Sequence, residues 1–158
     1  MRSIIGVMGA GESASQRDCE AAHALGCAIA KHGWILLCGR RNAGVMAAVC
    51  RGAREHQGIT VGILPGEDRK GMSDDVMIPI VTGMGSARNN INVLSSDLVV
   101  VLGHEPGAGT ISEAALAVKA GKPVYVLGSN QKLVDLLQSK VKAFGELDDL
   151  IEAIKQSL

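Results

Sequence analysis

Short apolar runs and amphipathic segments alternate along the whole chain. The apolar runs are rich in valine, isoleucine and leucine, as expected of strands buried on both faces of a parallel sheet. Between them, apolar residues recur every three or four positions, which is typical of helices that cover a sheet. The pattern predicts strands near Ser3–Met8, Trp34–Cys38, Ile59–Leu64, Val76–Val81, Leu98–Leu102 and Val124–Leu127.

Two amphipathic segments carry clear apolar stripes. One stripe runs from Val45 to Ala53 and the other from Leu147 to Leu158, and we interpret both as packing surfaces that face the core. The alternation of strands and helices predicts one α/β domain over residues 1–158, with a doubly wound, mostly parallel, Rossmann-like sheet of about seven strands.

One stretch breaks the alternation. Gly66–Asp75 reads GEDRKGMSDD and lies between two predicted strands. Polar, glycine-containing segments of this length serve either as mobile lids over a site or as exposed loops, and the sequence leaves both interpretations open.

Composition narrows the function class. The chain has 158 residues, enough for a core without a metal or disulfide staple. Lysine plus arginine equals aspartate plus glutamate at 16 each, and there is one Trp, one Tyr and one Phe, so we expect no nucleic-acid partner. The four cysteines form no Cys-x-x-Cys pair, so we expect reduced thiols and no metal site. No apolar run suits a membrane span or a secretory signal, which favours a cytoplasmic protein.

Glycine-bearing turns follow three of the predicted strands, at Gly9–Gly11, Gly39–Gly44 and Gly107–Gly109. Parallel strands end at the same edge of a sheet, so the turns should converge there. Glycine has no side chain, so an anion can approach its backbone closely, and the N-terminus of a helix favours negative charge. Glycine is, however, also common in tight turns that bind nothing. The pattern predicts a phosphate or carboxylate site that includes Gly9, Gly11, Gly39, Arg40, Gly44, Gly107, Ala108 and Gly109.

The first turn also raises a dinucleotide hypothesis. Its sequence GAGESA matches the pattern G-x-G-x-x-G/A. An NAD site wants an acid after the second strand, but Arg40 and Arg41 stand there and would suit only the 2′-phosphate of NADP. Without recognisable hydride-transfer residues, NADP binding is a minor alternative.

Arg88 is a candidate phosphate ligand, because its guanidinium can grip two phosphate oxygens. It begins a predicted helix after Gly83-Met84-Gly85. If the strand order reverses between the first and fourth strands, Arg88 should face the turn at Gly9–Gly11.

Glu113 has two interpretations. Thr110 and Glu113 form the T-x-x-E pattern of a capping box, in which both side chains serve only the helix start. Alternatively, Glu113 lies one turn inside a phosphate-facing helix, where a carboxylate can contact a sugar hydroxyl or act as a base. We expect the second role.

These residues together resemble the SLOG superfamily. The similarity rests on Gly44-Val45-Met46, on Arg88 eight residues before Ser96-Asp97, and on Gly107-Ala108-Gly109-Thr110-x-x-Glu113. That superfamily includes the Lonely Guy phosphoribohydrolases, proteins once labelled lysine decarboxylases, and the molybdenum-cofactor carrier proteins. The chain departs from the hydrolase pattern at Pro106, where a glycine is expected, and at Asn89, where a lysine is expected. It is therefore more similar to the carrier branch.

The resemblance implies a protein that binds a small phosphorylated, nucleotide-like or pterin-like ligand, with the molybdenum cofactor or a nucleotide as the bound molecule and no required cofactor. Arg88, Thr110 and Glu113 would contact it. The alternative is a nucleoside 5′-monophosphate phosphoribohydrolase in which Arg88 and Glu113 are catalytic. The sequence does not support lysine decarboxylase activity. The resemblance also implies that the protein is a homodimer or tetramer.

Overall fold

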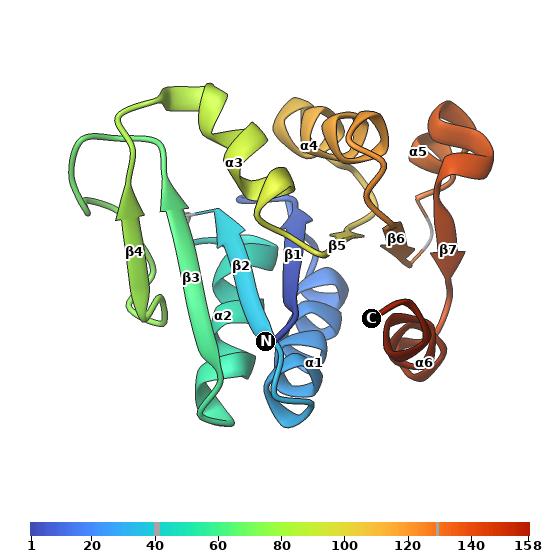
Figure 1. Cartoon of the computed structure of the whole chain (residues 1–158), viewed down its shortest axis with the longest axis horizontal. Coiled ribbons are helices and arrows are strands. Elements are labelled where there is room, and N and C mark those ends of the chain that lie inside the picture. The colour runs from blue at the N-terminus through green and yellow to red at the C-terminus, as the bar shows by residue number, and fades with distance from the viewer. Residues whose placement is uncertain (40–41, 129) are drawn as a thin grey trace.

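Seven parallel strands form the central sheet of the computed structural model, which describes residues 1–39, 42–128 and 130–158 (Figure 1). Their order across the sheet is β4-β3-β2-β1-β5-β6-β7. The predicted doubly wound α/β sheet is confirmed, and every strand pair within it is parallel. The strands are β1 (Ile4–Gly9), β2 (Ile35–Gly39), β3 (Ile59–Leu64), β4 (Ile78–Val81), β5 (Leu98–Leu102), β6 (Val124–Leu127) and β7 (Lys142–Phe144).

Helices cover both faces of the sheet and give a three-layer architecture (Figure 1). One face carries α1 (Gln16–Lys31), α2 (Gly44–Glu55) and α6 (Leu147–Ser157). The other carries α3 (Arg88–Leu94), α4 (Ala108–Lys119) and α5 (Gln131–Leu137). Short 3₁₀ turns at Gly85–Ala87 and Gln138–Lys140 precede α3 and follow α5. No helix among the described residues is both long and apolar enough to cross a bilayer.

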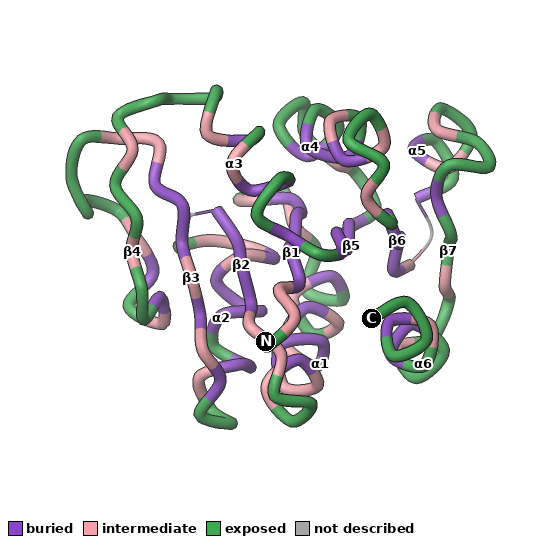
Figure 2. The backbone as a smooth tube through the Cα atoms, in the orientation of Figure 1, coloured by how far each residue is buried: buried purple, intermediate pink, exposed green. Residues whose placement is uncertain are grey.

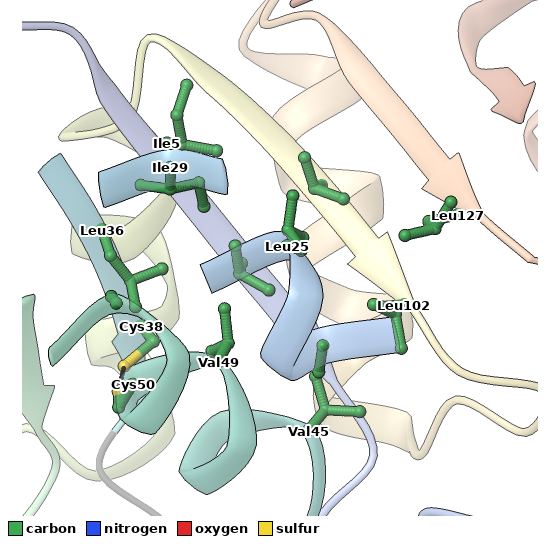
Figure 3. Close-up of a cluster of buried hydrophobic side chains, with 14 of the residues drawn as sticks. Ile5, Leu25, Ile29, Leu36, Cys38, Val45, Val49, Cys50, Leu102 and Leu127 are labelled. Carbon is green, nitrogen blue, oxygen red and sulfur yellow. Dashed lines mark hydrogen bonds between the residues drawn. The ribbon is translucent and has the colours of Figure 1, made fainter. Parts of the chain in front are cut away.

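The central strands are buried on both faces, as their apolar runs predict (Figure 2). In β5, Leu98, Val100 and Leu102 join the cluster under α1, α2 and α6, whereas Val99 and Val101 join the cluster under α3, α4 and α5. This division follows from the two-residue repeat of a strand. Figure 3 shows the first cluster, in which the sulfurs of Cys38 and Cys50 lie 3.2 Å apart as free thiols.

The edge strand β4 differs most from its prediction. It begins at Ile78 instead of Val76, because the Met77 amide donates to the Thr60 hydroxyl and the Val76 side chain packs above Gly62. The order of the strands reverses between β1 and β5, and β4 lies at the sheet edge. The expectation that the first and fourth strands flank the switch point is therefore wrong, because the chain adds strands outward from β1 before crossing back.

The irregular stretch after β3 is partly anchored. Residues 67–71 are exposed, whereas Met72 and Val76 pack against the cluster under α1 and α2. Buried Ser73 and the bond from the Thr60 hydroxyl to the Asp75 carbonyl fix the second half. Of the two interpretations that the sequence left open, a lid or an exposed loop, the exposed loop describes only the first half of this stretch.

Candidate functional site

The carboxyl ends of β2, β1 and β5 lie side by side in the middle of the sheet. The strand register pairs Val7 with Cys38 and Gly9 with Leu102, so these strands end close to the same level. The three glycine-bearing turns follow these ends and therefore converge at one edge, as the sequence predicts.

The first two turns are bonded to each other. The Val45 amide donates to the Ala10 carbonyl over 3.0 Å, and Gly44 has φ of +59°. A Cβ on Gly44 would lie 1.9 Å from the carbonyl oxygen of Gly11. Glycine at 44 is thus required by the contact between the turns.

Gly9 and Gly39 also have packing reasons to be glycine. A Cβ on Gly9 would lie 2.5 Å from Val45 Cγ1, and one on Gly39 would lie 2.9 Å from Arg88 Nη1. The missing side chain at the end of β2 is what lets the Arg88 guanidinium approach the sheet. Arg88 therefore lies against the second turn, at Gly39. The sequence had predicted that it would face the first turn, at Gly9–Gly11.

The third turn is different, because its glycines have no packing reason. Gly107, Ala108 and Gly109 are exposed, and a Cβ on either glycine would meet nothing within 4 Å. Neither glycine has positive φ. Gly107 is the N-cap of α4 and offers no side chain to the first helical amides. These amides are therefore available to an anion, and the helix dipole favours one there.

The helix after the first turn is capped by its own residues. α1 begins only at Gln16, and Ser15 with Asp18 forms a reciprocal capping box. In the dinucleotide pattern the helix opens directly after the glycines and leaves its amides for the pyrophosphate. This arrangement differs from that pattern, so the geometry does not favour the NADP alternative.

Two polar helix faces meet behind the third turn. Glu113 on α4 and Asn92 on α3 are buried, and the neighbouring Arg88 on α3 is partly buried, with exposed side-chain fractions of 14% for Arg88 and 9% for Glu113. Asn92 Nδ2 donates to Glu113 Oε1 over 2.7 Å, and Arg88 Nη1 lies 3.7 Å from the same oxygen. A second bridge joins Asn89 to Ser112, whose hydroxyl donates to the Gly109 carbonyl. Arg88 and Glu113 therefore lie close enough to act together, and that they do so stays a prediction.

The capping-box interpretation of Thr110 and Glu113 is wrong. α4 begins at Ala108, which puts Thr110 two residues inside the helix instead of at its N-cap. Glu113 points across to α3, and Thr110 is buried. The helix starts earlier because an N-cap residue needs only extended backbone, which Gly107 supplies at φ −67° and ψ 167°.

Arg40 and Arg41 lie outside the described residues. His104, at the third turn, has its Nδ1 3.3 Å from Asp18 Oδ1. Burial raises the pKa of Asp18, but hydrogen bonds from Ser15 and His104 outweigh it and hold that pKa below its usual value. His104 thus ties the third turn to α1.

The SLOG cluster4 family profile matches residues 2–154. The chain belongs to the SLOG cluster4 family. An uncharacterised protein of Archaeoglobus fulgidus is 44% identical over 124 residues, which cover 78% of each chain. The molybdenum cofactor binding protein of Rippkaea orientalis is 48% identical, with a TM-score of 0.92 over 99% of this chain and 97% of that one. The molybdenum cofactor carrier protein of Chlamydomonas reinhardtii is 45% identical, with a TM-score of 0.89 over 99% and 98%.

Membership of the SLOG cluster4 family confirms the resemblance stated from Gly44-Val45-Met46, Arg88 and the turn at Gly107–Gly109. Sequence reasoning missed Asn92, which is fully buried and holds Glu113. A signal was present, because Asn92 lies one helical turn after Arg88 and so shares its helix face. A polar pair on the buried side of a short helix indicates a polar partner across the interface.

The buried carboxyl of Glu113 makes stability depend on pH. Burial raises its pKa above the ordinary value of 4.5, although the Asn92 hydrogen bond and the Arg88 charge oppose this. A raised pKa in the folded state means that stability is lost as the pH rises from 4.5 through the folded pKa.

We therefore expect the Glu113→Gln variant to become increasingly more stable than the wild type as the pH rises through that window. The amide oxygen still accepts from Asn92, and the buried charge is gone. The difference in free energy of unfolding should grow with pH by at most about 1.4 kcal/mol per unit and then level off. Urea denaturation at several pH values measures it. A difference that shrinks with rising pH would contradict the prediction.

Proposed function

We propose that this protein binds the molybdenum cofactor, or a related small phosphorylated ligand, at the edge where the three turns converge. The observation that carries the proposal is the pair of exposed glycines at the start of α4, Gly107 at its N-cap and Gly109 in its first turn, where the N-cap supplies no side-chain cap. Packing does not require glycine at either position. A ligand that lies against the backbone would require it, since a Cβ would then occupy the ligand's place.

The helix start suits a phosphate group. Among the described residues, the N-cap supplies no side-chain cap to the first amides of α4, and α4 spans 12 residues, so its dipole favours an anion at this end. Arg88 contributes a positive charge from α3, 3.7 Å from Glu113, and the Glu113 carboxylate, one turn further along α4, can accept hydrogen bonds. These groups would bind a phosphorylated pterin through its phosphate and through its polar ring atoms or hydroxyls.

Space for the rest of such a ligand lies beside the third turn. A cavity of about 350 Å³ is lined by His104, Glu105, Pro106, Ile111, Lys132, Leu133 and Leu136. Its walls are mixed apolar and polar, as small-molecule sites usually are. Arg88 and Glu113 do not line this cavity, so we assign them to the phosphate side of the site.

The relatives support the choice of ligand. Proteins described as binding or carrying the molybdenum cofactor match almost the full chain at 44% to 48% identity. The direct test is to mix the purified protein with freshly released cofactor and to pass it through a desalting column. Molybdenum and pterin that elute with the protein in equal amounts support the proposal, and their loss contradicts it.

The Gly109→Ala variant separates the effect of this glycine on stability from its effect on ligand binding. Alanine fits the space and is the better helix former, so stability should be unchanged or rise by about 0.5 to 1 kcal/mol. Ligand affinity should fall by about tenfold, because the new methyl group stands where the ligand meets the backbone. Melting curves and the pterin retained after desalting measure the two effects. A variant that binds like the wild type would remove the third turn from the site.

A phosphoribohydrolase is the alternative that the superfamily resemblance leaves. Incubation with a panel of nucleoside 5′-monophosphates, followed by an assay for ribose 5-phosphate, tests it. Turnover that Glu113→Ala abolishes would favour the hydrolase over a pure carrier. The homodimer or tetramer and the lack of a nucleic-acid partner stay predictions.

A further inference from the structure

Away from the glycine turns, three metal-ligating side chains meet on the surface of α1 and α2. They are His23, Cys27 and Glu55, and one ligand atom from each lies within 4.8 Å of the others. His23 and Cys27 are one turn apart on α1, and Glu55 is the last residue of α2. His23 Nδ1 lies 3.8 Å from Cys27 Sγ, and His23 Nε2 lies 2.8 Å from Glu55 Oε2.

The backbone that carries these side chains is held rigidly. α1 and α2 cross at Gly26 and Gly52, where a Cβ on Gly52 would lie 2.1 Å from the His23 carbonyl oxygen and 3.1 Å from the Cys27 amide nitrogen. A Cβ on Gly26 would lie 2.1 Å from the Val49 carbonyl oxygen. Backbone contact this close fixes the position of Glu55 on α2 relative to the two ligands on α1, which lowers the entropy cost of orienting His23 for a metal ion.

We propose that His23 Nδ1 and Cys27 Sγ bind a Zn²⁺ ion, with Glu55 accepting a hydrogen bond from His23 Nε2. Thiolate and imidazole are the ligands that zinc prefers. Tetrahedral bonds of ordinary length would place a zinc-bound sulfur and nitrogen about 3.6 Å apart, close to the observed 3.8 Å. A histidine that binds zinc usually donates its other N–H to a carboxylate, and Glu55 occupies that position.

Room exists for the remaining zinc ligands. His23 lines a cavity of about 580 Å³ that reaches Cys19, Glu20 and Arg51 and extends to Gly44 in the second turn. Cys27 and Glu55 do not line this cavity, so water would reach the ion past the exposed side chain of His23 and complete the coordination. The side chains of His23 and Glu55 are 38% and 51% exposed, so the ion can enter from solvent.

Two other roles for the cluster fit less well. A surface ion pair between His23 and Glu55 would explain the contact at His23 Nε2. It would not explain why the Cys27 thiol lies beside His23 Nδ1. A reactive cysteine needs a pKa lowered by the protein itself, whereas burial and then the Glu55 charge raise the pKa of the Cys27 thiol. A Zn²⁺ ion displaces the thiol proton by its own charge when it binds. The spacing of the cysteines did not indicate this site, because only one of the two ligands is a cysteine and the supporting carboxylate comes from another helix.

Zinc titration of the wild type and three variants tests the proposal. Competition with a chromophoric chelator should give one Zn²⁺ per chain for the wild type, and Cys27→Ser and His23→Gln should each bind at least about tenfold more weakly. Cys19→Ser is the matched control, because Cys19 lies one turn before His23 on α1 and lines the same cavity, but its sulfur is not one of the three clustered ligand atoms. It should bind within about twofold of the wild type. Circular dichroism must show that each variant is folded.

Cobalt gives a second readout that a general loss of folding would not mimic. Wild type and Cys19→Ser loaded with Co²⁺ should show a thiolate-to-cobalt charge-transfer band, and Cys27→Ser should lack it. Zn²⁺ should raise the melting temperature of the wild type and of Cys19→Ser but not of the other two variants. No zinc binding by the wild type, or unchanged binding by Cys27→Ser, would overturn the proposal. Neither result bears on cofactor binding at the glycine turns.

Discussion

Gly44→Ala should destabilise the fold by about 3 kcal/mol or more, the largest effect that we expect of a single methyl group here. Gly44 has φ of +59°, a backbone conformation that costs other residues about 1 to 2 kcal/mol. Its new Cβ would also lie 1.9 Å from the Gly11 carbonyl oxygen and 2.5 Å from that of Ala10. Both atoms belong to the backbone of the first turn, so neither can rotate away.

Gly121→Ala is the matched control for this experiment. Gly121 has a similar φ of +69°, but a Cβ there meets nothing within 4 Å. It should therefore cost only about 1 to 2 kcal/mol, the conformational part of the effect. Chemical denaturation of the two variants and the wild type measures the difference. Equal losses would mean that the first two turns move apart freely, which would count against a site built on their contact.

Arg88→Ala should weaken the binding of a phosphorylated ligand by about 1.5 to 3 kcal/mol, the scale of a hydrogen bond to a charged group. Stability should fall as well, by about 1 to 3 kcal/mol, because Glu113 would keep its burial and lose its nearby cation. That loss is limited, since Glu113 can take up a proton and its pKa is already raised by burial. The fluorescence of a stable pterin with and without its phosphate measures the binding.

Two controls make the Arg88 result specific. Lys119→Ala removes a positive charge from the exposed last residue of α4, at the end opposite to the third turn, and should leave affinity unchanged. Arg88→Lys keeps the charge without the planar fork and should recover only part of the affinity. If Arg88→Ala bound the phosphorylated and dephosphorylated pterins with equal losses, Arg88 would be a structural partner of Glu113 and not a phosphate ligand.

The sequence predicted the architecture well because strand and helix periodicity are local. Six strand positions and the stripes of α2 and α6 were visible as patterns of apolar residues. The edge elements were harder to predict: β7, with three residues and no buried apolar run, was missed, and the largely exposed β4 starts two residues later than predicted. The candidate site was predicted in part, through glycines that follow strands and through Arg88 and Glu113.

By itself, the sequence determined that this is a Rossmann-like domain of the SLOG type with glycine turns at one sheet edge. The tertiary structure decided which glycines the fold requires, because the contacts that exclude a Cβ at Gly9, Gly39 and Gly44 come from segments distant in the chain, whereas a Cβ at Gly107 or Gly109 would meet nothing within 4 Å. It also decided that Glu113 serves Asn92 and Arg88 instead of a helix cap, and that His23 and Cys27 meet Glu55. Such pairings depend on how helices cross, and helix crossings are set by long-range packing that local sequence patterns do not encode.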